Sequence, residues 1–466
     1  MKCEIWNEKG ENALNRHHLL SGITKRLSKR FAIYSVLSSF LLLYVLSAGA
    51  SVAFAADEAD SLTTGAVQVR AKAAILIDAS SGQVLYQYNA DEARPPASMA
   101  KVMTEYLVNK AVKEGKLSWD QEVIVGDNAA KQDRRGSIIL LNTGDKHTVK
   151  QLYQAMAIFS ANDAAVQLAE TISGSEANFV ELMNETAQQL GMTNTHYVNS
   201  TGLELYMMPE AYRPASGETM MSARDTATLA YTIIKEFPEI LDTAKIPSLK
   251  FRERDKDPMI NWNWMLESNK ANANFKKFAY TGVDGLKTGN TDSAGKCFVG
   301  TSLINGTRLI SVVMGVPGTT QQGYRFIETA KMFDYGFNGF EKQTLLEAKA
   351  VVPEYETLKV KKGKSKKVAV VTATDLTLLV PKNSKTVPEL VEAKSAQDPL
   401  VAPIKTGDVV GTATYKYKDP STMEDKTVTI DLIASEDVGK ASWWQALFRA
   451  IGDFFRSLFN GIVNLF

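Results

Sequence analysis

The sequence is poor in the residues from which many hydrolases build their catalytic centres. It contains only two cysteines, Cys3 and Cys297, so it can form at most one disulfide bridge. It contains four histidines, and two of them, His17 and His18, lie near the N-terminus. A zinc site with several histidines, or a serine hydrolase with a histidine base, therefore has few residues to draw on.

No charge of one sign dominates the chain. Lysine and arginine total 53 and aspartate and glutamate total 52, so no basic excess points to a nucleic-acid partner. The hydrophobic fraction of 45% and the charged fraction of 23% are ordinary for a globular protein. They exclude collagen, a coiled coil, wholesale disorder and a protein with many membrane spans. The length of 466 residues allows two or three domains.

Residues 1–55 are typical of a leader with a secretory signal. Four basic residues between positions 25 and 30 precede an apolar run at 31–54, which ends in the small-x-small sequence Ala53-Phe54-Ala55. An uncleaved signal-anchor is the alternative, because the run is long enough to span a bilayer. Cleavage near Ala55 predicts an exported chain with 46 basic and 49 acidic groups.

Cleavage also removes Cys3 and two of the histidines. Cys297 then has no partner for an intramolecular disulfide, and His147 and His196 are the histidines that remain. We therefore expect no metal site and no other cofactor, and catalysis that does not depend on histidine.

Residues 66–345 are predicted to form one α+β domain. Hairpin patterns lie at 73–88, around Ser80-Ser81-Gly82, and at 296–316, around Asn305-Gly306, with a further strand just before the second hairpin. We expect these strands to meet in one antiparallel sheet packed with helices and joined to a helical subdomain. Helices are predicted at about 98–115, 148–159, 175–190 and 325–336, where Thr148 and Gln151 form a capping-box pattern.

Residues 346–438 are predicted to form a separate small all-β domain, a β-sandwich. Period-two alternation places Val428, Ile430 and Leu432 on one side of a strand. A hairpin is expected to turn at Gly363. Its lysine cluster at 359–367 is interpreted as a solvated hairpin, with an anionic wall polymer as the alternative ligand.

Residues 441–466 are predicted to form an amphipathic helix that anchors the protein at a membrane surface. Three charged residues, Arg449, Asp453 and Arg456, lie at the middle of the segment, where a spanning helix would bury them at high cost. The apolar residues, many of them aromatic, recur at helical spacing opposite the polar ones, which favours a helix lying in the membrane interface. The alternative is a helix that packs on the β-domain and has no membrane role.

The predicted chemistry starts from Ser98-Met-Ala-Lys101 at the beginning of a helix. Residues three apart on a helix share nearly the same face, so the Lys101 amine can reach the Ser98 hydroxyl. A serine needs a base to become a nucleophile, and a lysine serves only when it is neutral. Burial and a second cation both lower a lysine pKa. A second Ser-x-x-Lys match at 293–296 lies in a connection before a strand, where nothing fixes its two side chains together.

Two further short motifs accompany this pair. Ser160-Ala161-Asn162 lies at a turn between helices, where the hydroxyl can relay a proton and the amide can bind a peptide group. Asp163 is available to cap the second helix. Lys287-Thr288-Gly289 is expected to end a strand, whose edge offers unpaired groups to an extended peptide. A second Lys-Thr-Gly lies at 405–407.

The order S-x-x-K, S-x-N, K-T-G resembles that of the penicillin-binding proteins of the D-alanyl-D-alanine carboxypeptidase type. ILIDASSGQVLY, RPPASMAKVMT, SANDAA, NSTGL and DGLKTGNTDSAG also look like that family, and the resemblance extends over about 70–466. It implies a penicillin-binding, β-lactamase-like fold and removal of the terminal D-alanine from peptidoglycan stem pentapeptides. β-Lactams are the implied inhibitors. The implied location is the outer face of the cytoplasmic membrane.

The resemblance also implies a role for each motif residue. Ser98 is the acylated nucleophile, Lys101 its general base, and Ser160 a proton relay. Lys287 lowers the pKa of Lys101, and the backbone N–H groups of Ser98 and of the residue after Lys-Thr-Gly form the oxyanion hole. The implied substrate-binding residues are Asn162, Lys287, Thr288, Gly289 and Asn290.

Three alternatives stay open. A class A β-lactamase needs a carboxylate for deacylation; Glu204 and Glu210 lie in the right region, but no Glu-x-x-Leu-Asn pattern stands there. A D,D-endopeptidase acting on cross-links is chemically near. A penicillin-binding sensor without turnover is a different class, and the intact motifs argue against an inactive version.

Overall fold

The structure is a computed structural model that describes residues 67–419, 424–445, 447, 448 and 451. The predicted leader at 1–55 and most of the predicted helix at 441–466 lie outside these residues. Over the part of the chain that is described, no helix combines the length and the apolar character needed to cross a membrane.

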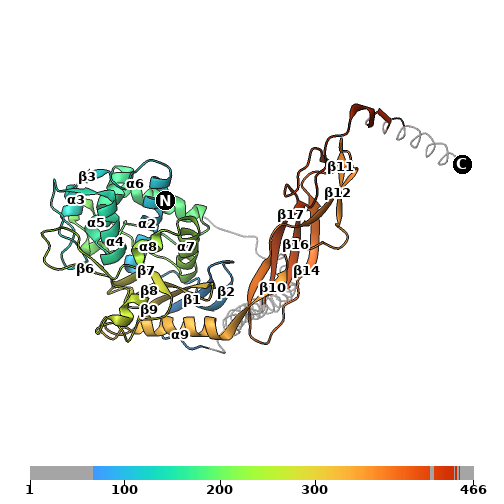
Figure 1. Cartoon of the computed structure of the whole chain (residues 1–466). Coiled ribbons are helices and arrows are strands. Elements are labelled where there is room, and N and C mark those ends of the chain that lie inside the picture. The colour runs from blue at the N-terminus through green and yellow to red at the C-terminus, as the bar shows by residue number, and fades with distance from the viewer. Residues whose placement is uncertain (1–66, 420–423, 446, 449–450, 452–466) are drawn as a thin grey trace, which may run out of the picture. The chain divides into compact units, whose positions relative to one another are not determined.

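A five-stranded antiparallel sheet forms the centre of the first domain (Figure 1). Its strand order is β2-β1-β9-β8-β7, so strands from the two ends of the domain meet as predicted. Both hairpin turns are confirmed, and Asn305 and Gly306 have φ values of 49° and 74°, as a tight two-residue turn requires. The strands are β1 (Ala73–Asp78), β2 (Val84–Tyr88), β7 (Val283–Thr291), β8 (Gly295–Ile304) and β9 (Thr307–Val316).

Helices cover both faces of this sheet, because successive side chains of a strand point to opposite sides. Ile75 and Ile77 of β1 pack in the cluster that contains α2 and α7, whereas Leu76 packs with residues of α9. Figure 1 shows α9 along one face of the sheet. The helices of this layer are α2 (Lys101–Lys113), α7 (Ala223–Glu236), α8 (Ile240–Ala244) and α9 (Tyr324–Gly339).

A helical subdomain has its own apolar core, which includes Val108, Leu152 and Met156. The predicted capping box is present, since Thr148 accepts the Gln151 N–H and Gln151 accepts the Thr148 N–H. Its helices are α3 (Asp127–Ala130), α4 (Val149–Phe159), α5 (Asn162–Ser173) and α6 (Glu176–Gln189). The short elements of the domain are β3 (Glu122–Ile124), β4 (Lys146–Thr148), β5 (Ser248–Leu249), β6 (Met259–Ile260), and the 3₁₀ turns η2 (Ala97–Ala100), η3 (Leu205–Met207), η4 (Glu210–Tyr212) and η5 (Glu267–Ala271).

The chain after α9 is β-rich. β10 pairs with β13, and a six-stranded sheet has the order β14-β16-β17-β12-β11-β15. Ile430 and Leu432 are buried in one apolar cluster, and Val428 packs against it, as the alternation predicts. The strands are β10 (Phe340–Leu346), β11 (Thr357–Lys361), β12 (Lys367–Thr372), β13 (Leu376–Pro381), β14 (Glu389–Ser395), β15 (Leu400–Val401), β16 (Val409–Lys418) and β17 (Asp425–Ala434).

Candidate active site

The Ser98 hydroxyl and the Lys101 amine are in direct contact. The helix predicted to begin at Ser98 forms in two parts, a 3₁₀ turn that carries Ser98 and then α2, which begins at Lys101. Lys101 Nζ lies 2.8 Å from Ser98 Oγ and donates a 3.0 Å hydrogen bond to the Thr201 carbonyl. The Lys101 side chain is fully buried. The motif therefore places a serine against a buried lysine.

Two causes lower the pKa of Lys101 well below the ordinary lysine value. Burial is the larger, and the positive charge of Lys287 is the second. Glu105 and Asp163 oppose both effects. The second cation expected from the sequence is thus present, but desolvation is the stronger influence on the amine.

Glu105 belongs to the same buried group of charges. It lies one turn after Lys101 on α2 and is 4% exposed. Burial raises its pKa to about 7, against the opposing charges of Lys287 and Lys101. Burial lowers the pKa of Lys287, although the charge of Glu105 raises it. The Glu105 carboxylate and the amines of Lys101 and Lys287 therefore form one buried group of charges near the nucleophile.

Ser160 and Asn162 reach the site from the junction of α4 and α5. Ser160 has the left-handed conformation (φ 64°) at the end of α4, and α5 begins two residues later at Asn162. Both side chains are buried, and neither Ser160 Oγ nor Asn162 Oδ1 has a hydrogen-bond partner among the described residues. Buried polar atoms without partners are uncommon, so these two are suited to meet a ligand.

Asp163 lies in the first turn of α5, and its Oδ1 accepts the Ala164 N–H of that turn at 3.0 Å. Its buried carboxylate accepts the backbone N–H groups of Ile139 and Leu141, on a segment that precedes α4. Asn162 N–H donates to the Ser137 carbonyl of the same segment at 2.7 Å. Asn162 and Asp163 therefore hold residues 137–141 against the start of α5. No local pattern marks this contact, because the two segments are about twenty residues apart.

Lys287-Thr288-Gly289 lies inside β7, not at the end of a strand as predicted. β7 continues to Thr291 because Asn290 and Thr291 go on pairing with β8, and β7 is an edge strand. Gly289 lies at a close approach of two backbone segments. A Cβ at this position would lie 2.4 Å from the Pro96 carbonyl, so Gly289 lets β7 approach the segment that carries Ser98.

Arg325 is a site residue that the sequence motifs do not reveal. It lies in the first turn of α9, is 3% exposed, and donates from Nη1 to the Gly289 carbonyl at 3.0 Å. Burial lowers its pKa to about 10. A buried cation at the cavity wall favours an anionic ligand. The packing of α9 on the sheet brings the Arg325 side chain to Lys-Thr-Gly, a contact that the sequence motifs do not indicate.

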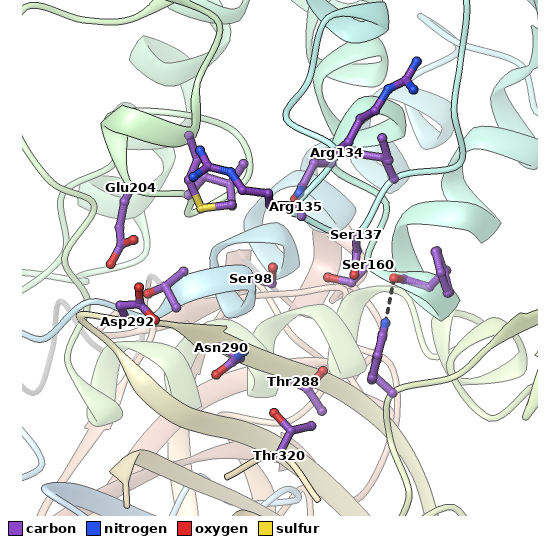
Figure 2. Close-up of a pocket in the computed structure, with 18 of the residues that line it drawn as sticks. Ser98, Arg134, Arg135, Ser137, Ser160, Glu204, Thr288, Asn290, Asp292 and Thr320 are labelled. Carbon is purple, nitrogen blue, oxygen red and sulfur yellow. Dashed lines mark hydrogen bonds between the residues drawn. The ribbon is translucent and has the colours of Figure 1, made fainter. Parts of the chain in front are cut away.

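These elements surround a cavity of 720 Å³. Ser98, Ser160, Asn162, Thr288 and Asn290 line it, whereas Lys101, Lys287 and Gly289 are not among its lining residues. Figure 2 shows Thr288 and Asn290 on one side of Ser98 and Arg134, Arg135 and Ser137 on the other. Further lining residues that the motifs do not reveal include Arg134, Arg135, Ser137, Phe159, Trp262 and Arg325.

The second copies of two motifs are used elsewhere. Ser293 Oγ donates to Glu218, and its N–H donates to Glu204 at 2.8 Å. The Lys296 amine donates to the Asn290 side chain, so the pair at 293–296 is not assembled. The Thr406 hydroxyl of the later Lys-Thr-Gly donates to Asp437. No cluster of His, Cys, Asp and Glu suited to a metal ion is found among the described residues.

Comparison with known proteins identifies the family. A family model described as D-alanyl-D-alanine carboxypeptidase matches residues 59–318. The chain belongs to this family. A second model, described as the C-terminal domain of penicillin-binding protein 5, matches residues 340–440. The chain is therefore a serine-type D-alanyl-D-alanine carboxypeptidase with an α+β penicillin-binding domain followed by a β-rich C-terminal domain.

Alignments with individual relatives extend over most of the length of this carboxypeptidase. It is 33% identical over 418 residues to D-alanyl-D-alanine carboxypeptidase DacF of Bacillus subtilis, which covers 90% of this chain and 98% of the relative. It is 34% identical over 392 residues to DacC of Escherichia coli, covering 82% and 87%.

Two solved structures are also similar. Penicillin binding protein 5 of Haemophilus influenzae has a TM-score of 0.62 at 30% identity, covering 81% of this chain and all of that one. The peptidoglycan synthesis regulatory factor (PBP3) of Streptococcus pneumoniae has a TM-score of 0.69 at 30% identity, covering 80% and 100%.

Proposed function

We propose that the carboxypeptidase removes the terminal D-alanine of peptidoglycan stem pentapeptides through an acyl-enzyme on Ser98. The single observation that supports this most strongly is the 2.8 Å contact between Ser98 Oγ and the Nζ of buried Lys101. A neutral Lys101 amine accepts the hydroxyl proton along this contact. The oxygen then attacks the carbonyl carbon of the penultimate D-alanine.

The intermediate collapses when the carbon–nitrogen bond of the terminal D-alanine breaks. In our proposal the backbone N–H groups of Ser98 and Asn290 stabilise the oxyanion. The proton held by Lys101 passes to the leaving amine through Ser160, whose hydroxyl lines the cavity. Water then attacks the ester carbon, Lys101 takes its proton, and the Ser98 hydroxyl is restored.

Substrate binding is proposed to use the edge of β7. An extended peptide can add to this edge as a further strand, with Asn162 binding a peptide group from the opposite wall. Lys287 and Thr288 are proposed to contact the terminal carboxylate. Arg325, which lines the same cavity, adds a third group suited to that charge. β-Lactams, which mimic the terminal dipeptide, are proposed to acylate the same serine.

The test is product analysis with a soluble stem pentapeptide ending in D-Ala-D-Ala. We expect one equivalent of free D-alanine per peptide with the parent chain, and none with Ser98→Ala. A matched peptide ending in D-Ala-L-Ala is the stereochemical control, and a cross-linked dimer of stem peptides is the second substrate. Cleavage of the dimer with no release from the pentapeptide would replace the carboxypeptidase by the endopeptidase. Acylation by penicillin without turnover of either peptide would identify a sensor.

We also propose that the mature enzyme acts at the outer face of the cytoplasmic membrane. The leader pattern at 1–55 supports export, and the tail pattern at 441–466 supports attachment at the membrane surface. The described residues from Trp443 onward are helical, and Ser442 and Gln445 form a capping box at the start of this helix. In this proposal a catalytic domain at 66–345 and a β-sandwich at 346–438 lie between leader and tail.

A further inference from the structure

The tip of the β11–β12 hairpin carries the densest positive charge of the β-rich region. Six lysines occur within nine residues, and residues 357–367 contain no acidic group. Leu358, Val360 and Val368 of the two strands point into an apolar core, so the alternating lysines are held on the outer side. All six lysines are exposed: Lys359, Lys361, Lys362, Lys364, Lys366 and Lys367.

The hairpin tip is joined to the chain that leads into the C-terminal tail. Lys364 N–H donates to the Gly439 carbonyl at 2.7 Å, and Ala441 N–H donates to the Lys362 carbonyl at 2.8 Å. Gly363 pairs with Lys440 in the bridge between these bonds. A side chain on residue 363 would not fit, because its Cβ would lie 2.7 Å from Val438 Cγ1. The backbone therefore fixes the start of the tail against the lysine cluster.

Large apolar side chains follow directly after this junction. Trp443 and Trp444 stack on each other, and their exposed fractions are 66% and 53%. Phe448, one turn further on, is 68% exposed. Exposed aromatic surface of this kind on a soluble chain marks a contact with a partner or a membrane. Leu447 and Ile451 are the other exposed apolar residues of the described tail.

We infer that the lysine hairpin binds the anionic phospholipid headgroups of the membrane surface that the tail enters. The inference rests on the membrane attachment proposed above and assigns a second, electrostatic contact to it. Apolar residues in the interface and lysines just above it are the two features that hold a peripheral protein on an anionic bilayer. An anionic wall polymer would account for the lysines but not for the aromatic residues fixed beside them.

Acidic residues near the junction do not cancel this charge. The Asp437 carboxylate accepts both the N–H and the hydroxyl of Thr406. Glu436 accepts the Ala369 N–H from β12. Lys440 adds a further exposed cation within the junction itself. These bonds leave both carboxylates charged, but the six hairpin lysines and Lys440 outnumber them, so the formal charge beside the tail is net positive.

The test is co-sedimentation of the signal-cleaved chain, residues 56–466, with vesicles. Neutral vesicles of phosphatidylcholine are compared with vesicles in which part of the lipid is phosphatidylglycerol. The hairpin variant changes Lys359, Lys361, Lys362 and Lys367 to Gln. The control variant removes the same charge from exposed lysines elsewhere in the β-rich region, namely Lys349, Lys382, Lys385 and Lys418.

Each lysine at an anionic surface contributes about a fivefold gain in affinity. We therefore expect the hairpin variant to bind anionic vesicles at least tenfold more weakly than the parent, with unchanged binding to neutral vesicles. The control variant should bind like the parent, and high salt should remove the difference between them. Circular dichroism and thermal unfolding show that the β-rich region of each variant is folded, and unchanged hydrolysis of a soluble D-Ala-D-Ala peptide shows the same for the first domain.

Equal binding of the hairpin variant and the parent to anionic vesicles would overturn the inference. So would an equal loss in the control variant, which would reduce the effect to net charge. Loss of binding to a lipid-free polyanionic wall polymer, with vesicle binding intact, would assign the lysines to that polymer instead. A chain lacking 441–466 tests the attachment separately: if it binds neutral vesicles like the parent, the tail proposal fails, whatever the lysines do.

Discussion

At the scale of single residues, the proposed chemistry requires that the Lys101 amine be neutral. Lys101 is buried with Lys287, and both influences lower its pKa in the direction that a base requires. Glu105 limits the effect, because its carboxylate favours the charged form of both lysines. The reactivity of Ser98 therefore depends on buried charges that are not among the residues lining the cavity.

The first prediction concerns Lys101 as the base. Lys101→Arg should lower the acylation rate by on the order of 10³-fold, because a guanidinium does not lose its proton in proteins. In the parent chain the acylation rate should fall as pH drops through the lowered lysine pKa, because the amine then becomes protonated. Stopped-flow measurement with a chromogenic β-lactam checks both. An active Arg variant, or a rate independent of pH from neutral to acidic, would refute the role.

The second prediction concerns Lys287 as the neighbouring cation. Lys287→Gln removes a charge that lowers the pKa of Lys101 and leaves Glu105 to act on Lys101 alone. Both changes raise the pKa of Lys101, so the acidic limb of the acylation profile should move to higher pH. Lys287→Arg keeps the charge and should leave the limb in place. If the acidic limb of the Gln variant stays at the same pH and only the maximal acylation rate falls, Lys287 contributes to substrate binding and not to the pKa of Lys101.

At the scale of elements, close backbone approaches hold the motifs together. A Cβ on Gly289 would meet the Pro96 carbonyl, and a Cβ on Gly202 would meet the Ala97 carbonyl in the 3₁₀ turn that carries Ser98. A Cβ on Gly202 would lie 2.0 Å from the Ala97 carbonyl oxygen. The residue before Gly202, Thr201, also accepts the Lys101 hydrogen bond. The nucleophile and its base are thus positioned by the same narrow contact.

The third prediction compares two glycines with nearly equal φ. Gly202 has φ 74° and faces the Ala97 carbonyl, whereas Gly115 has φ 71° and open space, with no described atom within 4 Å of where a Cβ would lie. Gly115→Ala should cost about 1–2 kcal/mol of stability and leave acylation intact. Gly202→Ala should cost about 3 kcal/mol or more and slow acylation about 10²-fold, because Ser98 is displaced. Thermal unfolding and acylation kinetics measure the two effects, and equal behaviour of the variants would contradict the positioning role.

The same scale explains what sequence reasoning could and could not foresee. Turns and helix caps depend on neighbouring residues, so the Asn305-Gly306 turn and the Thr148–Gln151 capping box were predictable. The contact of Ser98 with Lys101 was predictable for the same reason, because the two residues are three positions apart. The strand that continues past Lys-Thr-Gly depends on pairing with β8, and the position of Arg325 depends on how α9 packs. The Asp163 contact with Ile139 depends on a fold of the subdomain. Such contacts join segments that are distant in the sequence, so no periodic pattern of residues in the sequence predicts them.

At the scale of the whole molecule, catalysis and membrane attachment are assigned to different parts of the chain. The cavity is built within the first domain, whereas the exposed Trp443, Trp444 and Phe448 follow the β-rich domain. Deletion of one part should therefore leave the other function measurable. The two proposals can be tested without interfering with each other.

The fourth prediction follows from this separation. A chain lacking residues 441–466 should hydrolyse a soluble D-Ala-D-Ala peptide at the parent rate and move from the membrane fraction to the soluble fraction, because the apolar contact is removed. Fractionation and D-alanine release, measured on the same preparations, check the two halves. If the signal-cleaved truncated chain still sediments with membranes in high salt, which removes the lysine contact, the tail is not the anchor.

The central claim, that Ser98 is the acylated nucleophile, has one direct measurement. The signal-cleaved chain is treated with penicillin, digested, and mapped by mass spectrometry. We predict a single penicilloyl adduct on the peptide that carries Ser98, and no adduct in the Ser98→Ala variant. An adduct on Ser160 or Ser293, or labelling that survives Ser98→Ala, would contradict the account.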